Sequence, residues 1–363
     1  MRLWSGFCLV AMLVPSAPLW ASTPLSAAGD SIQAGVTTDR SRHELLVTAG
    51  PFNVPASEGR LQYMTMSDDT LVQSFAWPVA GWYRGFRLEV LDGGGNPAAR
   101  EVLHHLTVVN FDRRQLLYPI ADRLAAIGRE TGDVSMPRSV GMPMAVGQRI
   151  GLYAMWDNTT GHDMQDVYLR ITLLWTPANE APRPLDAMVM NMDVGLTGGV
   201  KNMFDIPPGW SQKSFEFRQP IDGRLLAVGG HLHDYGVSLQ LEDVQRHKTL
   251  VRITTTHDAK GRVSGVSRKL LGVFGDGLRL RANRQYRVLG VYDNSSSDTI
   301  RNVMAQMVGL FAPDDIHQWP AVHPTDPAYQ ADFRSHGRMD TQGMPHMARM
   351  QGPSQSSDPQ PHP

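Results

Sequence analysis

The sequence predicts an all-β protein built from two antiparallel β-sandwich domains in tandem. Three observations support this fold class. Short apolar or alternating runs recur along most of the chain, turn-forming residues separate them, and helical periodicity is nearly absent. The 363 residues include 34 glycines and 25 prolines, which suits many short strands better than long helices.

The runs fall into two sets. Residues 45–178 carry six of them, separated by turn chemistry such as "LDGGGNPAA" and "WDNTTGHD", with a single helical candidate at residues 119–130. The proline-rich stretch "TPANEAPRPLD" then predicts a linker. A second set occupies residues 185–312. Residues 313–363 are rich in Pro, His, Met, Gln and Ser, and we expect a flexible tail there.

The first 21 residues have the pattern of a secretory signal peptide. Arg2 precedes a short apolar run that Pro15 and Pro18 interrupt, and small residues suit cleavage near Ala21. The only cysteine, Cys8, lies inside this segment, so the mature chain would contain no disulfide. We therefore expect a periplasmic or secreted protein.

The charge balance excludes several classes of partner. Lys and Arg total 34 against 35 Asp and Glu, with no basic block, so nucleic acid is not an expected partner. No apolar run is long enough for a membrane span. The sequence also contains no nucleophile-elbow or phosphate-loop motif that would indicate a hydrolase or a nucleotide enzyme.

The motif "VGGHLHDYG" places His231 and His233 two residues apart in a strand-like run. Side chains at i and i+2 of a strand point to the same face, so both imidazoles would face one point. Either they bind a metal ion, or they form a hydrogen-bonded pair on a half-exposed face.

A second pair, His104 and His105, stands at the start of the apolar run "HHLTVVNF". Adjacent residues of a regular strand point to opposite faces, so both can serve one ion only if the backbone bends, as at a β-bulge. The alternative is one histidine packed inside and the other in solvent.

A methionine joins the His-x-His pair in the second set of strands. Met304 begins a late strand, while Met307, three residues on, is expected to face the other way. Two imidazoles and one thioether form a soft, open ligand set that suits copper, especially Cu(I). Taken alone, Met304 would be read as core filler.

This ordered series resembles the copper type II, ascorbate-dependent monooxygenases, the group of peptidylglycine α-hydroxylating monooxygenase and dopamine β-monooxygenase. The resemblance runs over residues 45–312. It implies two jelly-roll domains with one copper ion each, dioxygen activation at His231, His233 and Met304, and electron donation from a copper on His104 and His105. An external reductant such as ascorbate would supply electrons, O2 would be consumed, and a C–H bond of a small-molecule substrate would be hydroxylated.

The chain departs from that family at several positions. Where the family has a third histidine for the electron-donating copper, "LYAMWDN" has Met155; either Met155 replaces the imidazole, or the site is degenerate, with His162 as a further candidate. Where the peptide hydroxylase has an arginine and a tyrosine for its substrate, this chain has Gly229 and Val308, so a glycine-extended peptide is not expected.

Three functions follow in order of preference. The first is an exported copper-dependent monooxygenase-like protein. The alternative is a periplasmic copper-binding or copper-handling protein with the same fold and no catalysis. The third is a pair of carbohydrate- or surface-binding sandwiches without a metal.

Overall fold

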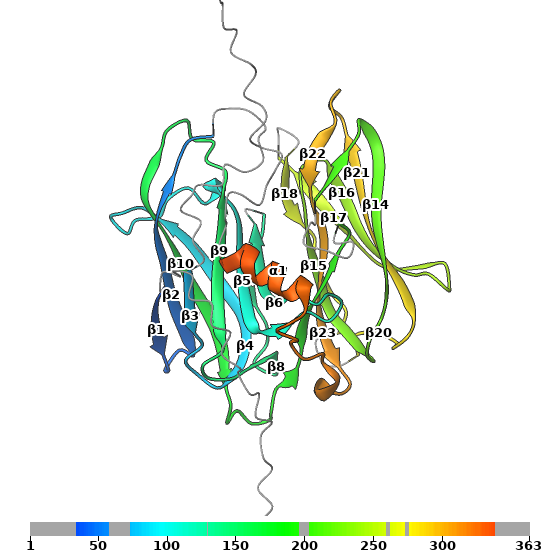
Figure 1. Ribbon diagram of the computed structural model, residues 1–363, viewed down its shortest axis with the longest axis horizontal. Coiled ribbons are helices and arrows are strands. Elements are labelled where there is room, and N and C mark those ends of the chain that lie inside the picture. The colour runs from blue at the N-terminus through cyan, green and yellow to red at the C-terminus, as the bar shows by residue number, and fades with distance from the viewer. Residues whose placement is uncertain are drawn as a thin grey trace, which may run out of the picture.

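Two β-sandwiches lie side by side in the protein, which confirms the predicted all-β class (Figure 1). The structure is a computed structural model that describes residues 34–57, 73–128, 130–195, 203–258, 262–272 and 276–337. The predicted signal peptide, residues 1–21, and residues 338–363 of the predicted tail lie outside this description. In the described ranges, no helix combines the length and the apolar character that crossing a bilayer requires.

Two sheets form the N-terminal sandwich. The larger has the order β1-β2-β10-β4-β8-β11, with β7 added beside β4, and the smaller has the order β3-β9-β5-β6. The pairings are antiparallel except that β11 runs parallel to β8. The strands are β1 (Gly35–Asp39), β2 (Glu44–Val54), β3 (Gln73–Ala76), β4 (Gly81–Leu91), β5 (Leu103–Arg114), β6 (Ala121–Gly128), β7 (Val134–Ser135), β8 (Val140–Met144), β9 (Arg149–Trp156), β10 (Met164–Pro177) and β11 (Leu185–Asp186).

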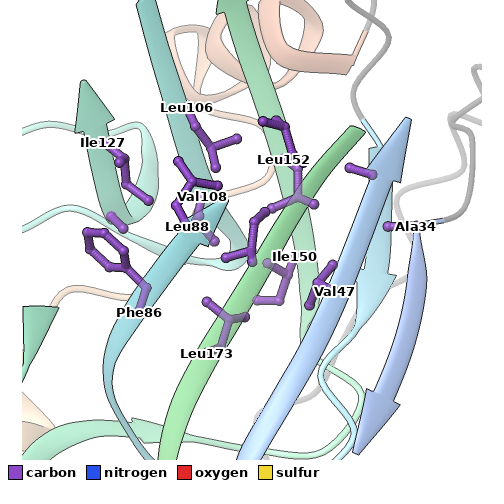
Figure 2. Close-up of a cluster of buried hydrophobic side chains, with 14 of the residues drawn as sticks. Ala34, Val47, Phe86, Leu88, Leu106, Val108, Ile127, Ile150, Leu152 and Leu173 are labelled. Atoms are coloured by element: carbon purple, nitrogen blue, oxygen red, sulfur yellow. The ribbon is translucent and has the colours of Figure 1, made fainter. Parts of the chain in front are cut away.

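The core of this sandwich lies between its two sheets (Figure 2). Val47 and Leu173 of the larger sheet, and Leu106 and Ile150 of the smaller one, are completely buried. Successive side chains of a strand point to opposite faces, so alternating apolar residues supply this inner layer. Each such side chain contributes about 1.5–3 kcal/mol on burial, and no disulfide is needed to hold the layers.

The C-terminal sandwich also has two main sheets. One has the order β12-β23-β15-β19 with β20 beside β15, the other has the order β14-β21-β16-β17-β18, and β13 pairs with β22. The strands are β12 (Met188–Asp193), β13 (Phe204–Ile206), β14 (Gly209–Arg218), β15 (Gly223–Leu232), β16 (Gly236–Asp243), β17 (Lys248–His257), β18 (Val263–Val266), β19 (Lys269–Leu270), β20 (Leu278–Leu280), β21 (Gln285–Asn294), β22 (Ile300–Val303) and β23 (Ala305–Pro313).

The two sandwiches share a packed boundary. A small buried cluster joins Val140 of the first domain to Leu226 and Ala312 of the second. At the other end of β12, the hydroxyl of Tyr118 donates to the carbonyl of Asp193 (3.2 Å) and accepts from its amide (3.0 Å). Because these contacts are buried, the outer face of the sheet β12-β23-β15 becomes an interdomain face rather than a solvent face.

The predicted helix at residues 119–130 was wrong. The structure has strand β6 there, paired antiparallel with β5, with Ile127 in the sandwich core and Ala121 on the opposite face. Alanine, leucine and isoleucine leave the periodicity of this short segment ambiguous between helix and strand. Hydrogen bonding to the edge of β5 that β9 leaves free makes the segment a strand.

The flexible tail predicted for residues 313–363 was wrong for the part up to residue 337, which has regular structure. After a 3-10 turn, η2 (Ile316–Gln318), helix α1 (Pro327–Gly337) returns to the first domain and covers β5 and β6 (Figure 1). Tyr329 is buried, and its hydroxyl donates to the carbonyl of Phe111. The carboxylate of Asp332 accepts from the guanidinium of Arg123 and from the amide of Ala121.

Candidate metal centre

A β-bulge at the start of β5 places both adjacent histidines on one side of the strand. The register to β9 slips between Leu103 and His105, while Leu103 and Leu106 both point into the sandwich core. The bulge therefore fits His104 and His105 between the two inward-facing leucines, and both histidines face outward. The structure thus has the bend that a shared site requires, with the rings of His104 and His105 4.0 Å apart.

The second histidine pair lies at the end of strand β15, where His231 is the last residue but one and His233 follows the strand. Leu232 points into the core of the C-terminal sandwich, so His231 and His233 on either side of it face the first domain. Their ring centroids are 5.1 Å apart. Val228 also lies in the core, so the intervening Gly229 shares the face of the two histidines.

The four imidazoles meet at the domain boundary. Nε2 of His105 lies 2.8 Å from Nε2 of His231, although 126 residues separate them. The ring of His233 lies 5.3 Å from that of His104 and 5.8 Å from that of His105. We call His104, His105, His231 and His233 the histidine cluster. His104 and His233 are buried, and the other two are half-buried.

This arrangement differs from the geometry that we expected. The resemblance implied one copper ion in each domain, with electrons passing from one site to the other across an open interdomain cleft. The 2.8 Å contact between His105 and His231 shows that the pairs touch, because the interdomain face of β15 packs against the bulged start of β5. The expected separation of the two histidine pairs was wrong, whereas the number of ions stays a prediction.

A buried carboxylate holds the ring of His231. Oε1 of Glu130 lies 2.6 Å from Nδ1 of His231, and only 5 % of the glutamate side chain is exposed. Burial acts to raise the pKa of Glu130, but the charge and hydrogen bond of His231 outweigh it and hold that pKa below its ordinary value. When His231 is neutral, as a metal ligand must be, a carboxylate at Nδ1 favours the tautomer with its proton on that nitrogen and leaves the Nε2 lone pair facing the cluster.

Glu130 was missed from the sequence. It follows β6 and lies 101 residues before its histidine partner, so no local motif connects the two. One local feature is consistent with its position: a Cβ on Gly128 would overlap the Glu130 carboxylate. Glycine at this strand end leaves the space into which the carboxylate folds.

Three of the four histidines of the cluster, all but His231, approach the spacing that one transition-metal ion requires. The candidate nitrogens of His104, His105 and His233 all lie within 4.8 Å of one another. Nitrogens bound at about 2.0 Å lie about 2.8–3.3 Å apart, so small ring rotations would bring the widest pair into range. The 2.8 Å between His105 and His231 already matches two neighbouring positions on an ion, although it also fits a hydrogen bond.

The two predicted methionines are backbone neighbours of the histidines. Met155 on β9 is directly opposite His105 in the strand register, and the amide of His233 donates to the carbonyl of Met304 (3.2 Å). The buried hydroxyl of Tyr292 donates to the same carbonyl (2.6 Å) and fixes the Met304 backbone. Cross-strand neighbours share a face, so each methionine flanks one histidine. Met307, by contrast, is fully buried in the core, as expected.

The other candidate for the first site, His162, is exposed in the turn between β9 and β10. It is not one of the described side chains that group as possible metal ligands.

Imidazoles alone suit zinc as well as copper, whereas thioethers at the edge of the site favour Cu(I). The donor set therefore fits copper, and it also fits zinc if the methionines do not bind.

An apolar cavity borders the cluster on the same interface. Its volume is about 320 Å³, and it lies between β15 and β23 of the second domain and β4, β6 and β8 of the first. His231 belongs both to this wall and to the histidine cluster, and its hydrogen-bond partner Glu130 lines the cavity as well. The site thus combines a possible metal centre with room for a small molecule.

Comparisons with known proteins do not place the chain in a family. No family model and no curated protein matches it. The solved structures that match include PNGF-II (TM-score 0.38, 12% identity, 74% of this chain and 66% of that one). They also include the major capsid protein P2 of bacteriophage PM2 (0.35, 10%, 73% and 98%) and PNGase F, a glycosylasparaginase of Flavobacterium meningosepticum (0.32, 8%, 73% and 96%). Likenesses at this level carry no argument about function.

Proposed function

We propose that the protein is an exported, copper-dependent oxidoreductase of the monooxygenase type, with its copper in the histidine cluster. The observation that carries the proposal is the convergence of two histidine pairs from different domains, seen in the 2.8 Å between His105 and His231. Buried imidazoles are costly to bring together unless their lone pairs find a proton or a cation.

Copper bound there would supply one-electron redox chemistry and a place for dioxygen. Overall, one oxygen atom would enter a C–H bond, and the other would leave as water. The two electrons and two protons would come from an external reductant such as ascorbate.

The chain's own groups would prepare the site for this chemistry. Glu130 holds the proton at Nδ1 of His231, so that Nε2 remains a lone-pair donor. The β-bulge aims His104 and His105 at the same point, and the packed domain boundary limits access of water. These residues position ligands and fix tautomers.

A second candidate function is copper binding or handling without turnover. The position of Met155 opposite His105 and of Met304 beside His233 favours it, because thioethers stabilise the reduced ion. A site that strongly stabilises Cu(I) would transfer its electron to dioxygen slowly.

Metal content and oxygen uptake separate these candidates. The purified full chain would be titrated with Cu(II), with Cu(I) under reducing conditions, and with Zn(II), each in competition with a chelator. Tight copper binding followed by ascorbate-dependent O2 uptake supports the oxidoreductase, while tight Cu(I) binding without uptake supports handling. Preference for Zn(II) over both copper states would overturn the copper assignment.

A further inference from the structure

The interdomain cavity has an apolar lining that the metal chemistry does not use. Tyr83 and Phe86 of β4, Met142 of β8, and Val308 and Leu310 of β23 form much of its wall. These side chains come from both domains, so the cavity exists only where the two sandwiches meet. Its volume of about 320 Å³ is within the range of small-molecule sites.

The floor of the cavity leads to the histidine cluster. Ala227, Gly229 and His231 all line it, and they succeed one another at every second position of β15. Gly229 leaves this floor open: the nearest heavy atom to a Cβ built there is Cγ of Arg268, at 3.6 Å. A molecule lying on Gly229 would therefore have one end beside the ring of His231.

The charged groups at the cavity already have protein partners. The guanidinium of Arg268 donates to the carbonyls of Gly132 (2.9 Å) and Asp133 (3.1 Å), and so links the second domain to the first. The carboxylate of Glu130 is held by His231. Both groups are held by protein contacts, and the rest of the lining is predominantly apolar, so it offers a charged ligand no compensating partner.

From this lining we infer that the cavity binds a compact, uncharged, apolar molecule, about the size of two fused rings, with one end at His231. A dry cavity of about 150 Å³ takes up benzene, so about 320 Å³ suits roughly twice that size. The identification of this molecule as the substrate rests on the proposed function, whereas its binding in the cavity does not.

Naphthalene and 2-naphthoate are suitable probes, because they share a ring system and differ by one carboxylate. The full chain would be titrated with each, in the metal-free and the copper-loaded state, by fluorescence or calorimetry. We expect saturable binding of naphthalene in both states and binding of 2-naphthoate weaker by about tenfold or more. Equal or tighter binding of 2-naphthoate would overturn the inference that the ligand is uncharged.

Substitution at Gly229 tests the location. Gly229→Leu fills the floor of the cavity, and we expect naphthalene binding to weaken by about tenfold or more. Gly229→Ala adds only a methyl group and should weaken binding much less. Thermal unfolding of both variants would show that each still folds. Wild-type affinity in Gly229→Leu would overturn the location.

The copper spectrum keeps the two proposals apart. In the copper-loaded protein, naphthalene should shift the Cu(II) electron paramagnetic resonance spectrum, because its end contacts a ring of the cluster. Binding of naphthalene by a chain that takes up no copper would refute the proposed function and leave the cavity ligand intact. Copper binding without any naphthalene binding would refute the cavity ligand alone.

Discussion

Nε2 of His105 lies 2.8 Å from Nε2 of His231, and this contact crosses the boundary between the two sandwiches. Each residue is held by its own strand: His105 by the bulge of β5 and His231 by the end of β15. The candidate metal site is therefore assembled by domain packing. Anything that separates the domains should open the site as well.

A single shared site predicts a shared loss of copper. His104→Ala and His233→Ala, one from each domain, should each reduce the copper affinity of the whole protein by more than about 100-fold. Removal of even a group that only supports a ligand costs about 10–100-fold, and a ligand should cost more. Chelator competition would measure this, with His317→Ala as the control because His317 is exposed elsewhere. A variant that keeps one full equivalent of copper at wild-type affinity would indicate two independent ions.

The support that Glu130 gives to His231 predicts a smaller effect. Glu130→Gln removes the charge that holds the proton at Nδ1 and should weaken Cu(II) binding by about 10–100-fold. Glu101→Gln, at an exposed glutamate close to β5, is a matched control and should bind copper like the wild type. Unchanged affinity in Glu130→Gln would show that the carboxylate does not act on the metal site.

Much of the fold was predictable, because alternation of apolar residues determines which face of each strand is buried. Segments whose structure depends on distant partners were not. Residues 119–130 become a strand by pairing with β5, and Asp332 acquires its partner from Arg123, more than 200 residues away. The sequence of neither segment indicates its distant partner.

The histidines of the site were predictable from strand geometry, but their meeting was not. Spacing of two places His231 and His233 on one face, and the His104–His105 pair requires a bulge, which the structure has. Convergence depends on how two domains pack, and no local pattern encodes that. Gly229 lies on the open floor of the cavity. The sequence alone shows only that this glycine departs from the family that the chain resembles.

The depressed pKa of Glu130 predicts a pH dependence of stability in the metal-free protein. Burial acts to raise this pKa, but the charge and hydrogen bond of His231 lower it below 4.5. A carboxyl group of this kind stabilises the fold above its unfolded pKa, and the contribution is lost as the pH falls through the folded pKa. The difference in unfolding free energy between wild type and Glu130→Gln should therefore start to shrink near pH 4.5 and vanish below the folded pKa. Urea unfolding at several pH values would measure it, and a difference that grows on acidification would contradict it.

The adjacent glycines of β15 should respond oppositely to the same substitution. A Cβ on Gly230 would lie 2.5 Å from Cδ1 of Leu239 and 2.8 Å from the carbonyl oxygen of Gln306, so Gly230→Ala should destabilise by about 1–3 kcal/mol. A Cβ on Gly229 would make only an ordinary contact, 3.6 Å from Cγ of Arg268, so Gly229→Ala should be neutral or stabilise by about 0.5 kcal/mol. Urea denaturation would compare them, and equal stabilities would show that the two faces of β15 are not distinguished as described.

The buried ion pair under α1 predicts a strong and coupled effect on stability. Asp332 and Arg123 have side chains only 2 % and 11 % exposed, with their nearest atoms 2.5 Å apart. Asp332→Ala leaves the guanidinium without this partner and should cost about 3–5 kcal/mol, while the double variant with Arg123→Ala should cost less than the sum of the single changes. Urea unfolding of the four proteins would give the coupling energy. Simple additivity would mean that α1 is held by the apolar contacts of Tyr329 and Phe333, and that the ion pair contributes nothing of its own.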